Sequence, residues 1–399
     1  MKTQFPPPDS MRDSTNGPVP AVFTDRSTFN SYPFWSPRFW AGMRLEHWLP
    51  LLARNGFRIH PLRMPFALLT TGAAVSNTAL CLIQQLVYGR RIRMTQPVAP
   101  PIFILGHWRT GTTFLQEMLW HDPRLATPSN YQVYSANHFL LTETLAQRFL
   151  KFLLPGKRPM DNVTIQWESP QEDEWARVTM GLPSPYLRCA FSNEPSPFND
   201  YFDMDSLSPA EIDVWKKGFV RFLQCVTLRT GKRLVFKSPH NTGRIKLLHQ
   251  MFPDAKFIHV TRHPFTVFPS TLRMYRSFDF SQSLQKPSDG DGLESYVLES
   301  GKRMYDSYHA YRAHVPAEQI IDVRYDDLIR DPLGKMREIY EHLGLGSMEP
   351  ALEGFRKYLR PRTSYVTNRH ELPGYWQERI RSEWNAYFEA FGYTSDDAA

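Results

Sequence analysis

Four short apolar runs, interspersed with stretches of helical character, give the first indication of the fold. Each run has the length and composition of a strand that is buried on both faces. The runs lie in residues 102–105, 234–236, 256–262 and 319–325. This pattern predicts an α/β protein of three layers, in which a central, mostly parallel sheet lies between two layers of helices.

A different pattern precedes the first run, because no charged residue occurs between Arg63 and Arg90. Polar pairs recur there at seven-residue spacing, so they line one face of a helix, and the opposite face is apolar. The polar pairs are Thr70-Thr71, Asn77-Thr78 and Gln84-Gln85, and the apolar face carries Leu68, Val75, Ala79, Leu82 and Leu86. The sequence therefore predicts an amphipathic helix rather than a membrane span.

Three roles for this helix remain open, and a true membrane span is the least favoured of them. It could pack against the domain that contains the sheet, as surface helices of globular proteins do. It could instead make peripheral contact with a membrane through residues 63–93, because basic residues flank the apolar stretch at both ends. The flanking residues are Arg58, Arg63, Arg90, Arg91 and Arg93.

Composition divides the chain into three parts. Residues 1–38 are rich in Pro, Ser, Thr and Asn without periodicity, which predicts a flexible tail. Residues 39–99 form a helical N-terminal extension, and residues 100–399 form the main domain. No basic segment followed by an apolar one, as in a signal sequence, occurs early in the chain.

Charge and cysteine content narrow the function. The formal charge of +7 and the pI near 9.2 suit an enzyme for anionic ligands. No long Lys/Arg block is present, so we expect no nucleic-acid partner. Three widely separated cysteines predict neither a disulfide framework nor a zinc site. They favour a reducing compartment, and we therefore expect a cytoplasmic protein that can associate with a membrane.

The loop after the first apolar run, GHWRTGTT, has the features of an anion site. Gly106 and Gly111 bracket it, and a helix begins at Thr112. Glycines let the backbone point its N–H groups inward, and the helix adds its positive dipole end. The loop nearly matches the ATP- and GTP-binding signature, but Thr112 stands where the lysine should be, and the cation is Arg109 inside the loop. An arginine fork suits a phosphate or sulfate group.

The run R-T-G-T-T-F-L after an apolar strand resembles the 5′-phosphosulfate loop of sulfotransferases. The resemblance implies the P-loop, nucleotide-kinase-like sulfotransferase fold and 3′-phosphoadenylyl sulfate (PAPS) as co-substrate, without a metal. The sulfuryl group would pass to a hydroxyl or amine of an acceptor. The implied donor-binding residues in the loop are Gly106, His107, Trp108, Arg109, Thr110, Gly111, Thr112 and Thr113.

Three later segments resemble the same family in the same order. Arg262, at the end of an apolar run, and Ser270, in a helix expected to reach Tyr275, resemble its 3′-phosphate site. The run Tyr325-Asp326-Asp327-Leu328 resembles a segment whose tyrosine approaches the nucleotide. Residues 360–369 resemble the last phosphate- and adenine-binding segment, with Asn368 and Arg369 as candidate ligands.

The resemblance also suggests catalytic residues. Arg109 and Lys237, the latter in the run RLVFKSPH, would stabilise charge on the transferred and leaving groups. His240 is a candidate general base, although it lies one position further from Lys237 than in the Lys-x-His pattern of cytosolic sulfotransferases. The run ESPQEDEW instead offers carboxylates that could bind or deprotonate the acceptor, with Glu174 as a candidate. The other interpretation is that these acidic residues lie in the first turn of a helix and complement its dipole.

The acceptor stays unidentified at this level. Aromatic content in residues 131–152 and the amphipathic helix favour a lipid or glycolipid that bears a hydroxyl group, and a carbohydrate, a tyrosine or a small alcohol stays open. Two other functions are weighed against a sulfotransferase. A P-loop kinase or NTPase would need the loop lysine that is missing here, and a non-catalytic membrane-surface protein would leave Lys237, Arg262 and Ser270 unexplained.

Overall fold

The computed structural model describes residues 29–30, 32–33, 36–149, 166–288, 292–360 and 372–394. Its centre is a five-stranded sheet in the order β2-β3-β1-β4-β5, and every pair of neighbouring strands is parallel. The strands are β1 Ile102–Leu105, β2 Leu125–Ala126, β3 Arg233–Lys237, β4 Lys256–Thr261 and β5 Ile320–Arg324. The predicted α/β fold with a parallel sheet is confirmed.

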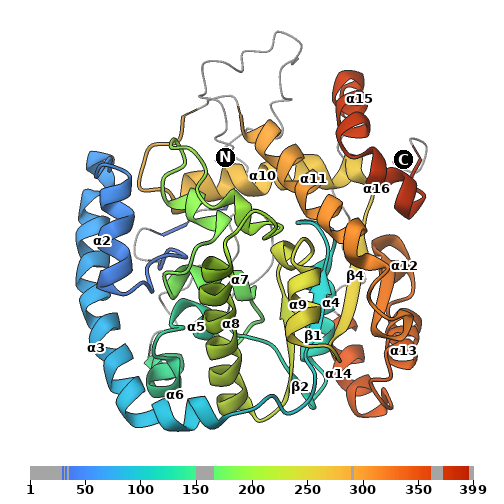
Figure 1. The fold of residues 1–399 in the computed structure, drawn as a ribbon, viewed down its shortest axis with the longest axis horizontal. Coiled ribbons are helices and arrows are strands. Elements are labelled where there is room, and N and C mark those ends of the chain that lie inside the picture. The colour runs from blue at the N-terminus through green and yellow to red at the C-terminus, as the bar shows by residue number, and fades with distance from the viewer. Residues whose placement is uncertain are drawn as a thin grey trace.

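Helices cover both faces of this sheet (Figure 1). The helices that follow β1 in the described residues are α4 Thr112–Trp120, α5 Asn130–Tyr134, α6 Phe139–Phe149, α7 Asp173–Thr179, α8 Pro209–Thr230, α9 Ile245–Met251, α10 Pro264–Gln282, α11 Leu293–Arg312, α12 Tyr325–Arg330, α13 Pro332–His342, α14 Glu349–Leu359, α15 Gly374–Glu383 and α16 Asn385–Phe391. Alternate residues of β1 belong to two different apolar clusters, because successive side chains of a strand point to opposite faces. Phe103 packs in one cluster and Ile104 in the other, and both are fully buried.

Strand β1 lies between β3 and β4, and this position brings three chain segments to one edge of the sheet. Ile104 is paired with Lys237 at the end of β3, and Leu105 is paired with His259 of β4. In parallel sheets the carboxyl ends of neighbouring strands meet, and ligands bind in the crevice where the connections diverge to opposite faces. The loop that begins at Gly106 and the residue that follows β4, Arg262, therefore lie at this edge.

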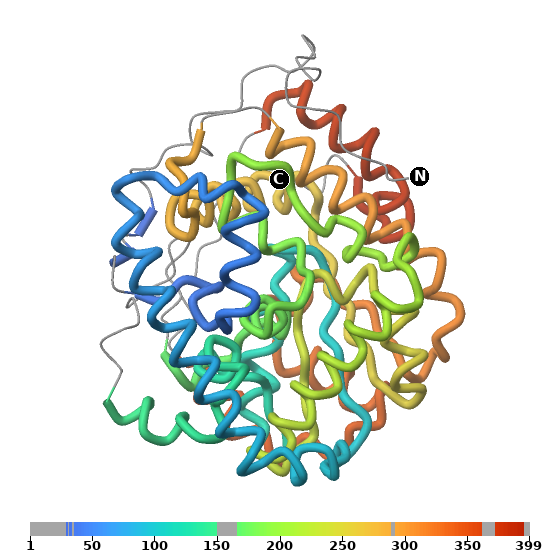
Figure 2. Tube along the Cα trace, turned by 60° about the vertical axis from the view of Figure 1, so that its left-hand side comes forward, coloured from blue at the N-terminus to red at the C-terminus, as the bar shows by residue number. Residues whose placement is uncertain are grey.

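The helical extension that precedes the sheet is present as α2 Leu45–Arg54 and α3 Met64–Met94. The two helices lie side by side at one side of the molecule, at the left of Figure 1, and α3 runs across the front of Figure 2. Together with the turn before it, α3 is long and apolar enough to cross a membrane by length and composition, and 28% of its most apolar window is buried.

The helix packs against the protein through its polar face. Thr71 Oγ1 accepts a hydrogen bond from Trp48 Nε1 at 2.9 Å, and Thr78 Oγ1 accepts one from the backbone N–H of Leu45 at 2.9 Å. Gln84 Nε2 donates to the carbonyl of Asn137 at 2.9 Å. The amphipathic pattern predicts this helix correctly, but the polar stripe faces the protein and the apolar stripe faces outward.

Candidate active site

Backbone conformation shapes the loop between β1 and α4. Gly106, Arg109 and Gly111 have φ values of 141°, 68° and 96°. A Cβ atom on Gly106 would lie 2.6 Å from the carbonyl oxygen of Val260, and one on Gly111 would lie 2.2 Å from the ring of Tyr325. Both positions therefore require glycine, for the positive φ and for the close approach of neighbours.

The loop residues divide into an inner and an outer set. His107, Trp108, Thr110 and Thr112 are buried beneath the loop, whereas Arg109, Gly111 and Thr113 are partly exposed. His107 Nδ1 lies 3.0 Å from the carbonyl of Trp108, and burial lowers the pKa of its imidazole to about 4. The outer set lies at the start of α4, where backbone N–H groups and the helix dipole favour an anion.

Four predicted donor-binding residues meet around this loop. Arg109 Nε donates to Ser270 Oγ at 2.8 Å. Arg262 Nη1 donates to the carbonyl oxygen of Arg109 at 3.1 Å. The guanidinium of Arg262 also lies over the ring of Tyr325, 4.3 Å from its centroid. Residues that follow β4 and β5 thus gather around the loop that follows β1.

Lys237 occupies the opposite side of the loop, at the carboxyl end of β3. Its side chain is only 2% exposed, and Nζ lies 2.7 Å from Glu172 Oε1 and 3.4 Å from Thr113 Oγ1. The other oxygen of Glu172 accepts a hydrogen bond from the Tyr186 hydroxyl at 2.7 Å, and that hydroxyl accepts one from Trp108 Nε1 at 2.7 Å. The side chain of Glu172 is 14% exposed, so its carboxylate lies at the boundary between the buried network and the loop surface.

Burial and the neighbouring carboxylate of Glu172 raise the pKa of the Tyr186 phenol well above its ordinary value. Tyr186 is therefore a neutral donor that fixes the orientation of Glu172. Sequence reasoning identified the acidic run but did not select Glu172, and it missed Tyr186 entirely. The available signal for Glu172 was its place just after Pro170 and Gln171, where it precedes the first residue of α7.

Glu174, the carboxylate selected from the sequence, has different surroundings. It is fully buried, pairs with Arg177 and Arg244, and accepts a hydrogen bond from Ser184 Oγ at 2.6 Å. Burial acts to raise the pKa of the Glu174 carboxyl, but the two guanidinium groups outweigh it and hold the pKa well below its usual range. Glu174 is thus a structural anion with no exposed oxygen. The candidate for taking the proton of the acceptor hydroxyl is Glu172 instead.

His240 is also enclosed. Its ring stacks on Phe202 and lies edge-to-face against Tyr186, with centroids 5.2 and 4.5 Å apart. Burial lowers the pKa of the imidazole to about 3, so the ring is neutral at physiological pH and a weak base. The geometry supports a packing role against Tyr186 rather than the base role expected from the sequence.

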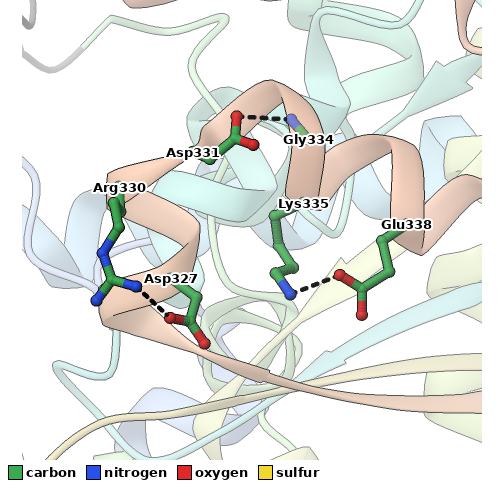
Figure 3. A pocket seen from close by; sticks show the side chains of 6 residues that line it. All are labelled: Asp327, Arg330, Asp331, Gly334, Lys335 and Glu338. Atoms are coloured by element: carbon green, nitrogen blue, oxygen red, sulfur yellow. Dashed lines mark hydrogen bonds and ion pairs between the residues drawn. The ribbon is translucent and has the colours of Figure 1, made fainter.

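Asn368 and Arg369 lie outside the described residues. A surface depression of about 370 Å³ on α12 and α13, shown in Figure 3, is lined by charged residues that already pair with one another, and we assign no ligand to it. Its lining residues are Asp327, Arg330, Asp331, Gly334, Lys335 and Glu338.

Comparison with known proteins agrees with this geometry. Residues 100–350 match the model described as the sulfotransferase family. The chain is 39% identical over 359 residues to the omega-hydroxy-beta-dihydromenaquinone-9 sulfotransferase Stf3 of Mycobacterium bovis and of Mycobacterium tuberculosis, covering 90% of this chain and 92% of each relative.

Solved structures share the fold. The sulfotransferase STF1 of Mycobacterium tuberculosis superposes with a TM-score of 0.60 at 19% identity, covering 92% of this chain and 97% of that one. STF9 of Mycobacterium avium gives a TM-score of 0.61 at 18% identity, covering 87% and 96%. The glycine loop with its internal arginine, the parallel sheet that carries it and these matches lead to one conclusion: the chain belongs to the sulfotransferase family.

Proposed function

We propose that this enzyme transfers the sulfuryl group of PAPS to the hydroxyl group of a lipid acceptor. The observation that carries the proposal is the convergence of Arg109, Lys237 and Glu172 on one short loop at the carboxyl edge of the sheet. The Stf3 relatives support the acceptor class, since their name gives an omega-hydroxylated dihydromenaquinone as substrate. Family membership and the arginine in place of the loop lysine favour sulfuryl transfer over the phosphotransferase alternative.

The residues present fit the donor. Gly106 and Gly111 let the loop pack closely against Val260 and Tyr325, where a Cβ atom would clash, and so fix the loop conformation that turns backbone N–H groups toward an anion. Arg109 and the N–H groups of residues 111–113 would hold the 5′-phosphosulfate. Arg262 and Ser270 would hold the 3′-phosphate, and Tyr325 would pack beside the nucleotide. When bound, the donor supplies an activated sulfuryl group, and no metal is needed in this scheme.

The protein groups then act on two oxygens, the acceptor hydroxyl oxygen that gains the sulfuryl group and the bridging phosphate oxygen that loses it. Glu172 takes the proton of the acceptor hydroxyl, whose oxygen forms a bond to sulfur. The bond between sulfur and the bridging phosphate oxygen breaks, and that oxygen keeps the electron pair and leaves as part of adenosine 3′,5′-bisphosphate. Lys237 and Arg109 stabilise the charge that develops on the leaving and transferred groups.

A lipid acceptor also bears on where the enzyme works. Its substrate would reside in a bilayer, so the enzyme would be a cytoplasmic protein that acts at the membrane periphery. The helical extension, with its outward apolar face, supports this location.

A transfer assay tests the proposal. Purified enzyme is given radiolabelled PAPS and an omega-hydroxylated menaquinone in detergent, and the sulfated lipid is counted. We expect product with PAPS and none with ATP and magnesium, and product formation roughly 10²- to 10³-fold slower with the variant Lys237→Ala. Transfer to a water-soluble hydroxyl compound but not to the lipid would overturn the acceptor class. Phosphorylation of the lipid from ATP would overturn the donor.

A further inference from the structure

The outward face of α3 is apolar along its whole middle section. Leu68, Val75, Leu82, Leu86 and Val87 have exposed fractions of 66%, 53%, 57%, 86% and 58%. Isolated exposed leucines are common, but a continuous row on one helix marks an interaction surface. We call this row, from Met64 to Val87, the outer face of α3.

The outer face does not pack in the protein core, because the opposite, polar face of α3 already makes the hydrogen bonds that attach the helix to the rest of the protein. Asn77 Nδ2 donates to the carbonyls of Ala41 and Met43 at 3.2 and 3.0 Å, and Gln84 Oε1 accepts from the N–H of Leu140 at 2.9 Å. These bonds join α3 to two other parts of the chain. A helix tied down in this way lies on the protein surface and does not cross a bilayer.

Along the sequence the charge of this region has one sign, and in the structure Arg58 is paired with a carboxylate from elsewhere in the chain, Glu194, with Nη1 3.0 Å from Oε2. Between His47 and Gln116 the sequence contains no aspartate or glutamate and no lysine, but it contains seven arginines. Arg58 and Arg63 lie before the outer face, and Arg90, Arg91 and Arg93 follow it. The basic groups thus flank an uncharged apolar strip at both ends.

Other apolar side chains border the strip. Leu62 and Phe57, just before α3, are 84% and 58% exposed. Phe280 is 41% exposed and belongs to the same border, since its carbonyl accepts a hydrogen bond from Arg63 Nη2 at 3.0 Å. The apolar surface therefore continues past Arg63, which precedes α3, onto α10.

We propose that the outer face of α3 docks on a bilayer that contains anionic lipids, with the helix axis parallel to the membrane plane. Apolar side chains would enter the acyl boundary, and the flanking arginines would contact headgroup phosphates. This inference rests on the proposed lipid acceptor, for which it names the surface from which the substrate is taken.

A second copy of the chain fits this face less well. In a two-fold symmetric pair the same patch meets itself, so the arginines of α3 would face an identical patch. Residues 48–115 contain no carboxylate to offset Arg63, Arg90, Arg91 and Arg93, whereas Arg58 is already paired with Glu194. An anionic lipid surface supplies the missing negative charge.

The docked helix is also connected to the site through aromatic rings. Trp48 bonds to Thr71 of α3 and stacks on Trp40, with ring centroids 5.1 Å apart. The residue before Trp40, Phe39, stacks on Trp175 with ring centroids 3.5 Å apart. Trp175 in turn stacks at 3.9 Å on Tyr186, the residue that bonds to Glu172. The extension that meets the membrane is thus packed directly behind the proposed base.

Vesicle co-sedimentation tests the docking surface without donor or acceptor, so its result is independent of the proposed reaction. The full-length protein is mixed with phosphatidylcholine vesicles with or without phosphatidylglycerol. We compare the wild type with Leu68→Gln/Leu82→Gln/Leu86→Gln. The matched control is Val214→Gln/Ile329→Gln, which changes residues that are 52% and 38% exposed on α8 and α12.

The wild type and the control are expected to sediment with vesicles that contain phosphatidylglycerol, and the triple variant at least about tenfold more weakly. Binding should weaken when phosphatidylglycerol is left out. The single variant Leu86→Gln, at the most exposed position of the face, gives the same comparison if the triple variant misfolds. Equal sedimentation of wild type and variants would overturn the proposal. A wild type that does not bind vesicles would also overturn it. The same holds if light scattering shows that the wild type is a dimer and that the triple substitution dissociates it.

Discussion

Lys237 Nζ lies 2.7 Å from Glu172 Oε1, at the point where the end of β3 meets the start of α7. The lysine is almost completely buried and the carboxylate is largely so, and each neutralises the other before any substrate is present. The pair therefore joins the group proposed for the leaving oxygen to the group proposed for the acceptor. Tyr186 holds the second oxygen of Glu172, which fixes the direction of the carboxylate.

Replacing the proposed base gives the first prediction. In Glu172→Gln the amide cannot take the acceptor proton, so we expect kcat to fall by about 10²- to 10⁴-fold. Donor binding should change little. The measurement is steady-state sulfation, with Glu168→Gln as control, because Glu168 is an exposed carboxylate of the same acidic run. A Glu172→Gln enzyme with normal kcat would remove Glu172 from the mechanism.

Lys237 is expected to act mainly in the transition state. Lys237→Ala should lower kcat by roughly 10²- to 10³-fold, as for loss of one donor to a developing oxyanion. Lys232→Ala provides the control, since Lys232 is exposed and lies just before the same strand. A loss confined to KM would show that Lys237 serves binding alone.

Arg109 and Arg262 should act on donor binding. Calorimetry with adenosine 3′,5′-bisphosphate, without metal, is expected to show affinity at least about tenfold weaker in Arg109→Ala and in Arg262→Ala, because each removes charge-assisted hydrogen bonds to a phosphate. Arg330→Ala, at an exposed surface pair, should bind like the wild type. Unchanged affinity in either loop variant would contradict its placement at a phosphate.

The loop glycines can be tested against a glycine of similar backbone conformation elsewhere. Gly111→Ala combines a positive φ with a Cβ atom 2.2 Å from Tyr325, and it should abolish binding of adenosine 3′,5′-bisphosphate. Gly231, at the end of α8, also has positive φ but open space around it, so Gly231→Ala should cost only about 1 kcal/mol of stability and leave binding intact. Equal behaviour of the two variants would show that the contact with Tyr325 is unimportant.

His240 makes a prediction about pH. Its folded-state pKa of about 3 lies below the unfolded value, so protonation favours the unfolded chain. The stabilisation by neutral His240 is present above pH about 6.5 and is lost progressively as the pH falls toward 3. In His240→Asn, denaturant unfolding should show a slope of stability against pH that is smaller by up to about 1.4 kcal/mol per pH unit in that window. The pH profile of kcat should keep its shape, and loss of the acidic limb, in which kcat rises with pH, would restore His240 as the base.

Much of the fold follows from the sequence, since the apolar runs match four of the strands. The meeting of Arg109, Lys237 and Arg262 was also predictable, because the carboxyl ends of parallel strands share an edge. The helix after β4 was expected to end near Tyr275, but it runs to Gln282 and so has a longer buried face than the local sequence indicates.

Two features could not be predicted, and both depend on orientation rather than on identity. Glu172 and Glu174 lie two residues apart, and which of them reaches the loop depends on where α7 begins. Glu174, inside the helix, turns toward Arg244, whereas Glu172, just before it, turns toward Lys237. In α3 the two faces are evident from the sequence, but only the partners of Thr71 and Thr78 decide which face points inward.

The contacts of the N-terminal extension bear on how this enzyme could be divided or recombined. Trp40 Nε1 donates to the carbonyl of Gln282, and Asn137 Nδ2 donates to the carbonyls of Gly42 and Thr179. The family match begins at residue 100, but residues 100–399 are therefore not an independent folding unit. A catalytic fragment cut there would lose the Phe39 ring that stacks on Trp175 and one of the two carbonyls to which Asn137 Nδ2 donates. Chimeras that exchange acceptor preference between relatives should carry residues 39–94 together with the acidic run, as one transferable unit.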